Sequence, residues 1–440
     1  MARPQPPPWL PITQAPDLAR EAIDSASRSL SGGNARDALR AAGWAWHHQR
    51  YLREAYEMGG RAAKEIGETE LARALFAIVA EPSIPGPWLQ AGWALVDQGW
   101  SDLAIPLLEE AHRIEPENVE ARESLVIAYS DEGRHEEVVA LASPMNLSER
   151  PSLAFPLTWS ALMVRRTELV ERAMKSLSDL AQKVPEVRGV HAKAVAAIER
   201  YCAFPPENDI RHWHYVQYGG ITLDLCEDLD LAGGRYNLVS FSYERVASVL
   251  RRLVAVCHEL EVPRGPWGFA NRDGEILALA LAALTGTSAV NGVPRDGWLV
   301  AGDPRDIDSQ RDGYDLSAPG VRTFALTFPW MIWGPKVMDV TGLWVELAVL
   351  PWNGGWRQGA GAGSGVREVP VDRRPAGSIA VDIVAAAASA ATAATHGRDL
   401  LDFVRARRRV LTLTQREAPR GLPYVPDAPL PFASVSGVLG

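Results

Sequence analysis

Polar residues in a short loop between a predicted strand and a predicted helix are the first candidates for chemistry in this sequence. The loop at 271–274 follows an apolar stretch and precedes a helical stretch at 275–284. Backbone N–H groups at such a helix N-terminus carry partial positive charge and bind phosphate or other anions. The sequence therefore predicts an anion site formed by Arg272, Asp273 and Gly274.

A second polar group begins just after the strand predicted at 298–301. Asp303 and Arg305 start it, and further charged residues follow at positions 306, 308, 311 and 312. Ligands bind α/β sheets at the carboxyl ends of their strands, so this group is a candidate for a metal or phosphate site. The commoner interpretation is a solvated loop whose acids and arginines pair with one another.

Two histidines, His212 and His214, flank Trp213 beside a stretch whose residue types predict a strand at 214–223. On a strand both rings would lie on one face, where a pair of imidazoles can bind a metal. No cysteine or carboxylate follows at ligand spacing, so surface or packing roles are favoured. We therefore predict neither a metal nor a cofactor.

Tryptophans are concentrated in the second half of the chain, at positions 267, 298, 330, 333, 344, 352 and 356. Such side chains either line an aromatic groove for a peptide or fill a core, and the core interpretation is favoured. The sequence contains no nucleophile elbow, Walker A loop or HExxH motif.

Composition and charge narrow the class of protein. The 440 residues are 47% hydrophobic and 22% charged, with a net charge of −9, which is typical of globular proteins. The negative charge argues against nucleic-acid binding. Three cysteines without paired spacing, an N-terminus without a signal-peptide pattern and no apolar stretch of membrane-spanning length predict a cytoplasmic protein without a membrane partner. Its residue usage is typical of GC-rich bacterial genomes.

The elements that position the polar loops alternate between strands and helices from 236 to 350, which predicts a mainly parallel sheet. Their order resembles the first half of a type I phosphoribosyltransferase, in which the loop after the first core strand binds pyrophosphate. On that resemblance Arg272, Asp273 and Gly274 occupy the pyrophosphate-loop positions.

The second half departs from the phosphoribosyltransferase pattern. The family has two acidic residues after a hydrophobic strand, which hold the ribose hydroxyls, and then small hydroxyl residues around a glycine. Here Phe328 and Pro329 stand at the acidic positions, Gly334 fits, and Lys336 replaces a small hydroxyl residue. A phenylalanine supplies no oxygen ligand for magnesium. We therefore expect a degenerate, non-catalytic domain rather than an enzyme.

The first half carries small and aromatic residues at the spacing of a helix–turn–helix repeat: Trp88, Gly92, Leu95, Gly99, Ala104, Leu108, Ala111 and Pro116. This pattern resembles a tetratricopeptide repeat (TPR), whose period is about 34 residues. The next window continues it at Tyr129, Gly133 and Val138, and the preceding one fits at Tyr56, Gly60 and Gly67 but is two residues short. The alternative is a plain bundle of helical hairpins.

The predicted fold class is an all-α TPR-like solenoid followed by an α/β domain with a mainly parallel sheet. The expected parts are a disordered arm (1–16), the solenoid (17–203), the phosphoribosyltransferase-like core (204–353), a Gly-rich linker (354–375), an Ala-rich helix (376–409) and an extended tail (410–440).

Stacked hairpins offer a groove to a protein or peptide, which predicts an adaptor or scaffold and leaves a homo- or hetero-oligomer open. The alternative is a divergent nucleotide or phosphosugar transferase with Arg272, Asp303, Arg305 and Lys336 around an anion.

Overall fold

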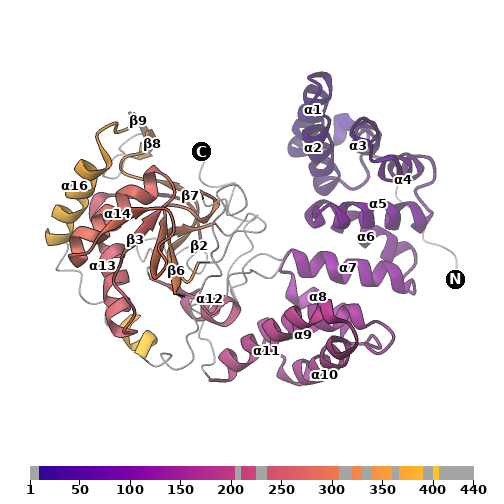
Figure 1. Cartoon of the computed structure of the whole chain (residues 1–440). Helices are drawn as coiled ribbons and strands as arrows, with labels where there is room; N and C mark the ends of the chain where they lie inside the picture. The colour runs from indigo at the N-terminus through magenta and orange to yellow at the C-terminus, as the bar shows by residue number, and fades with distance from the viewer. Residues whose placement is uncertain are drawn as a thin grey trace. The chain divides into compact units, whose positions relative to one another are not determined.

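The computed structural model of the chain consists of two compact units, Met1–Ala194 and Val195–Gly440, shown in Figure 1. The structure describes residues 9–203, 210–223, 235–306, 320–329, 338–358, 366–389 and 400–405. Among these residues, no helix is both long enough and apolar enough to cross a membrane.

Unit 1 is built from antiparallel helices that pack in sequence, each mainly against its neighbours in the chain. They are α1 (Asp17–Ser31), α2 (Ala35–His48), α3 (Arg53–Glu65), α4 (Thr69–Ala80), α5 (Pro85–Asp97), α6 (Ser101–Ile114), α7 (Val119–Asp131), α8 (His135–Ala142), α9 (Ala154–Met163) and α10 (Thr167–Lys183). The boundary between the two units falls within α11 (Arg188–Ala203).

Five turns between paired helices of unit 1 share one backbone motif. Each has a left-handed residue one position after the helix C-cap: Gly33, Gly67, Gly99, Gly133 and Arg165, with φ between 60° and 86°. The N–H groups of this residue and the next donate back into the last helical turn, as in the bonds from Gly99 to Val96 O and from Trp100 to Leu95 O, both 2.9 Å. This is the Schellman motif. Its recurrence every 32 or 34 residues identifies five helical hairpins.

We expect Arg165→Gly to raise the free energy of unfolding by about 0.5–1 kcal/mol, because only glycine adopts positive φ without steric cost from a Cβ. Urea titration of the full chain measures this change. Arg165→Ala is the control, since it shortens the side chain but keeps the Cβ and gives no such gain. A loss of stability in the glycine variant would contradict the prediction.

A cluster of aromatic residues fills the core where the first three hairpins meet. Tyr56 on α3 stacks on Trp46 of α2 with ring centroids 5.3 Å apart. Tyr56 also forms a T-shaped contact with Trp88 of α5, with centroids 5.4 Å apart. Trp46 Nε1 also donates to the Leu103 carbonyl oxygen of α6 at 3.0 Å. Helix α2 of the first hairpin therefore packs directly against α6 of the third, although the hairpin α3–α4 lies between them in the sequence.

The described part of the N-terminal arm packs against unit 1, which differs from the disordered arm expected for 1–16. Trp9 lies 5.6 Å from the ring of Tyr56. The Leu10 N–H donates to the Tyr51 carbonyl oxygen at 2.8 Å, beside a parallel bridge between Leu10 and Leu52. The arm thus adds an aromatic side chain and one strand-like contact to the core of unit 1.

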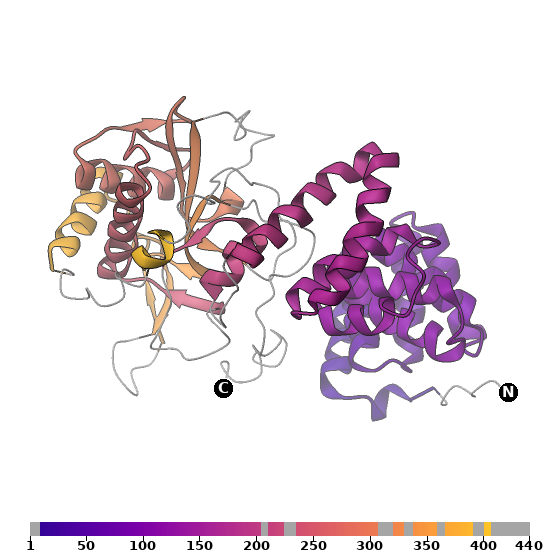
Figure 2. The same ribbon diagram turned by 90° about the horizontal axis from the view of Figure 1, so that it is seen from below.

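Unit 2 contains the predicted parallel sheet. Its elements are α12 (Ile210–Tyr218), β1 (Ile221–Thr222), β2 (Arg235–Ser240), α13 (Tyr243–Glu259), β3 (Trp267–Phe269), α14 (Arg272–Thr285), β4 (Ala289–Asn291), β5 (Gly297–Ala301), β6 (Val321–Phe328), β7 (Val340–Val349), β8 (Gly355–Gln358), β9 (Val366–Val369) and α16 (Ala376–Ser389). The strand order is β1-β7-β6-β5-β3-β4, with β2 also paired to β7. Helices α13, α14 and α16 pack together (Figures 1 and 2).

The connection from β4 to β5 crosses the face of β3 at a glycine. Strands β4 and β5 are both parallel to β3 and lie on either side of it. A Cβ on Gly268 would lie 2.2 Å from the Gly292 carbonyl oxygen and 2.6 Å from Pro294 Cδ. No side chain fits there, because the connecting backbone occupies its space.

Two segments of unit 2 differ from the sequence-based expectation, and a third, the Ala-rich segment, is helical wherever it is described. The stretch predicted as a strand from 214 begins as a helix, since α12 continues to Tyr218. The predicted linker contains the antiparallel hairpin β8–β9. The Ala-rich segment is helical at Ala376–Ser389 and again at 400–405, with the residues between outside the described ranges.

Candidate functional site

The residues of the predicted repeat signature are mainly packing residues. Trp88, Gly92 and Leu95 of α5 are buried, as are Ala104, Leu108 and Ala111 of α6. A Cβ on Gly92 would lie 2.6 Å from Leu108 Cδ2, so the glycine permits the close approach of the two helices. Gly99 forms the turn and Pro116 follows α6. The signature residues therefore form the interior of the repeat, and few of their side chains are accessible to a partner.

The face of unit 1 available to a partner carries an exposed tryptophan. Trp93 on α5 is 48% exposed. Leu89 and Val96, four residues before it and three after it, are half-buried on the same side of the helix. Ile127 is the equivalent residue of α7, one repeat later, and is also half-buried. Because α5 packs against α7, we define these four residues as the Trp93 face.

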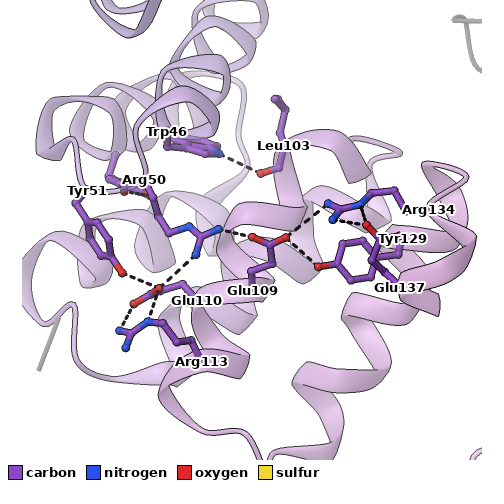
Figure 3. A network of polar contacts seen from close by, with 11 residues as sticks. Trp46, Arg50, Tyr51, Leu103, Glu109, Glu110, Arg113, Tyr129, Arg134 and Glu137 are labelled. Carbon is purple, nitrogen blue, oxygen red and sulfur yellow. Dashed lines mark hydrogen bonds and ion pairs between the residues drawn. The ribbon is translucent and has the colours of Figure 1, made fainter. Parts of the chain in front are cut away.

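A network of charged and hydroxyl groups joins four helical segments of unit 1 (Figure 3). Glu109 on α6 forms an ion pair with Arg50, which follows α2. Its Oε1 accepts a hydrogen bond from the Tyr129 hydroxyl of α7 at 2.9 Å and lies 3.6 Å from Arg134 Nη1, just before α8. Arg134 also forms an ion pair with Glu137 of α8 at 2.7 Å. One carboxylate thus connects the ends of helices from three hairpins.

The neighbouring Glu110 has a side chain with no exposed surface. Arg113 donates two hydrogen bonds to its carboxylate, and the Tyr51 hydroxyl donates a third at 2.8 Å. Burial alone would raise the pKa of Glu110, but these bonds and the charges of Arg113 and Arg50 lower it overall. Arg113 and Arg50 therefore favour the ionised form of Glu110. The network connects α6 to α7, to α8 and to the segment that follows α2.

Sequence reasoning did not find this network. The sequence signal for it is the adjacent pair Glu109-Glu110, which follows an apolar stretch of α6. Two neighbouring residues of a helix point in directions about 100° apart, so the two carboxylates need separate partners. Arg50 and Tyr51, nearly sixty residues earlier in the sequence, are among these partners. The repeat period does not predict that the segment after α2 lies against α6.

The three predicted pyrophosphate-loop residues lie together at the start of α14, bonded to protein groups. Arg272 Nη2 donates to the carbonyl oxygens of Asp372 at 3.0 Å and Arg374 at 2.8 Å. The Asp273 carboxylate accepts from Trp352 Nε1 at 2.7 Å and Asn353 Nδ2 at 3.0 Å. The Gly274 N–H donates to the Asn271 side chain, the N-cap of α14, at 2.9 Å. These bonds hold the segments after β7 and β9 onto α14.

The second predicted group is close to the first. A Cβ on Gly302 would lie 3.1 Å from Asp273 Cβ, so the ends of β3 and β5 meet as expected for parallel strands. Asp303 and Arg305 form an ion pair, and Arg305 lies 3.3 Å from Glu346 on β7. The side chains at 306, 308, 311 and 312, which complete the predicted group, lie outside the described residues. Gly334 and Lys336 lie outside the described residues.

The positions equivalent to the acidic pair are apolar and buried. Phe328 has no exposed surface and packs against Trp344, His214 and Tyr218, with centroid distances of 5.1, 5.5 and 5.8 Å. Pro329 is also buried. The ring contacts described for Phe328 are with an imidazole, a phenol and an indole, none of which is a carboxylate.

The predicted strand pairing of His212 with His214 is wrong, because both residues lie on helix α12. Residues two apart on a helix point to different sides: His212 stacks on Phe403 at 5.1 Å, whereas His214 packs among the aromatic rings around Phe328. Burial, followed by the charge of Arg200, lowers the pKa of His214 to about 3. In the ranges that the structure describes, no three histidine, cysteine or carboxylate side chains gather to hold a metal.

The tryptophans of unit 2 that can be placed are core residues. Trp267 and Trp298 stack with centroids 5.9 Å apart. These two, together with Trp344 and Trp352, are at most 1% exposed. The side chains at 330, 333 and 356 lie outside the described residues. These four candidates for an aromatic groove are therefore core residues instead.

No protein-family model and no curated protein matches this chain. Among solved structures, a thermophilic TPR protein from Thermus thermophilus aligns at 18% identity, over 40% of this chain and 98% of its own, with a TM-score of 0.21. MamA 41-end from Desulfovibrio magneticus aligns at 20% identity over 38% and 95%, with a TM-score of 0.20. TM-scores this low do not establish a shared fold. The repeats of unit 1 are therefore assigned from their shared turn motif.

Proposed function

We propose that this protein is an interaction adaptor that binds a protein partner through the Trp93 face of unit 1. The observation that supports this is the 48% exposure of Trp93 on a helix whose other tryptophan, Trp88, is buried. Tryptophan is among the residues that dominate binding energy at protein interfaces. Stacked helical hairpins present neighbouring helix faces as one extended surface, so Ile127 of α7 extends this apolar face.

Replacement of Trp93 by alanine is expected to weaken partner binding at least about tenfold, the effect typical of a tryptophan hot spot. The matched control is Phe76→Ala, because Phe76 is an aromatic residue on α4 with 39% exposure. Full-length protein carrying a photo-crosslinking residue at 93 or at 76 identifies the partner, and titration with the purified partner gives the affinities. Equal effects of the two alanine variants would contradict binding through the Trp93 face.

We infer that unit 2 is a non-catalytic module. The support is chemical: Phe328 and Pro329 are buried and apolar, and the polar atoms of Arg272 and Asp273 bond protein groups. Calorimetry with phosphoribosyl diphosphate and magnesium is expected to show no binding and no pyrophosphate release. Magnesium-dependent binding, weakened by Arg272→Ala, would instead favour the divergent transferase.

A further inference from the structure

Carboxyl groups from two helices gather at the first turn of α6. Asp102 lies in that turn, and Asp131 and Glu132 end α7. Ser101 Oγ donates to Asp131 Oδ2 at 2.9 Å. This bond holds the α7–α8 turn against the beginning of α6.

Glu132 is the member of this cluster that is buried without full hydrogen bonding. It is 8% exposed, and its Oε1 atom has no hydrogen-bond partner. A buried carboxylate with an unpaired oxygen is costly, whereas the protonated carboxylic acid loses far less on burial. The geometry alone therefore favours the neutral form of Glu132.

The charged groups around Glu132 strengthen this preference. Helix α6 supplies Asp102, α7 supplies Asp131, and the entry to α8 supplies Arg134, while Arg40 and His47 of α2 face Asp102. Burial first, and then repulsion from Asp102 and Asp131, raise the pKa of Glu132 to about 8, although Arg134 and the Asp102 N–H act in the opposite direction.

We propose that Glu132 is a proton-dependent latch for unit 1. In its protonated form it holds the α7–α8 turn on the first turn of α6. In its ionised form the buried carboxylate faces Asp102 and Asp131, and opening the turn relieves this repulsion by exposing it to water. Arg134, two residues later, lies 3.6 Å from Glu109, so opening also weakens the network that joins α6 to α2. The latch does not depend on the adaptor function.

The direction of the pH dependence follows from proton linkage. The closed turn binds the Glu132 proton more tightly than the open turn, in which a glutamate has its ordinary pKa of 4.5. The closed form is therefore fully favoured below pH 4.5, and this advantage is lost as the pH rises through about 8. For these two values the local opening constant increases about 10- to 100-fold between pH 6 and pH 9.

Amide hydrogen exchange of the full chain, corrected for the intrinsic rate at each pH, measures this opening in peptides that cover 100–104 and 132–138. We expect the predicted increase in the wild-type protein and a nearly flat response in Glu132→Gln, which is neutral at every pH. Glu120→Gln is the matched control, because Glu120 is an exposed glutamate of the same helix, and it should keep the wild-type response.

Asp102→Asn provides a second readout that does not alter Glu132. Removal of one repelling carboxylate lowers the pKa of Glu132, so the increase in opening between pH 6 and pH 9 should shrink. An unchanged increase in either Glu132→Gln or Asp102→Asn, or a flat wild-type response, would overturn the proposal. If Glu132→Gln fails to fold, the Asp102→Asn comparison still decides the question.

Discussion

Replacement of Trp46 by alanine is expected to lower the free energy of unfolding of unit 1 by about 3–5 kcal/mol. Trp46 has no exposed surface and stacks on Tyr56 with an interplanar angle of 12°. Its indole N–H also bonds the Leu103 carbonyl oxygen of α6. The variant therefore loses a large buried ring and the indole hydrogen bond from α2 to α6, and it leaves a cavity where three hairpins meet.

Urea denaturation of the full chain, followed by circular dichroism, measures this loss. Trp93→Ala is the matched control, because it removes the same side chain from an exposed position and should change stability by less than about 0.5 kcal/mol. Trp46→Phe keeps most of the ring contact but loses the hydrogen bond, at an expected cost of about 1 kcal/mol beyond the smaller ring. Equal losses in Trp46→Ala and Trp93→Ala would show that the α2–α6 contact contributes nothing.

The second large effect is expected for Glu110→Ala, which should destabilise unit 1 by about 2–4 kcal/mol. The side chain of Glu110 is fully buried, and its removal leaves Arg113 and the Tyr51 hydroxyl without their shared acceptor. The loss falls below that of a wholly buried pair, since Arg50 and Arg113 keep 29% and 36% of their surface in contact with water. The same urea titration measures it.

Glu110 also predicts an acid sensitivity that alanine should remove. The pKa of Glu110 is lower in the folded protein than the ordinary value of 4.5. Its stabilising contribution is therefore complete above pH 4.5 and is lost as the pH falls through the folded value. The difference in stability between wild type and Glu110→Ala should shrink when the titration is repeated at progressively more acidic pH. Glu115→Ala, at an exposed site directly after α6, is the control and should show no such convergence.

Local sequence patterns predicted those elements whose structure depends on residues close together in the sequence. The glycines at 67, 99 and 133 were found in the sequence because a left-handed C′ position strongly selects glycine. The helices on either side of Arg165 were predicted as part of the solenoid, but the repeat pattern was not recognised there because an arginine occupies the position of the glycine. The parallel sheet was predicted from the alternation of strands and helices, whereas its strand order followed only from the structure.

Contacts between residues far apart in the sequence explain what sequence reasoning missed at the candidate site. Arg272 and Asp273 were predicted in the loop before a helix and lie in its first turn. Their partners, near 352 and 372, come from segments eighty to a hundred residues later. The aromatic and β-branched residue types after His214 predicted a strand, but a short apolar segment also fits a helix packed on both sides. Burial of this segment against Phe328 and Trp344 favours the helix.

The direct packing of α2 on α6 has a consequence for how unit 1 folds. In an ideal linear array each repeat touches only its neighbours, so stability adds up locally and the ends fray independently. Here a hydrogen bond joins residues 57 positions apart, and the chain must close that loop before either helix is fully covered. Such long-range closure raises contact order and slows folding. The contact also links the first hairpin to the third. We therefore expect the three hairpins to unfold together as one cooperative unit, rather than one after another from the N-terminus.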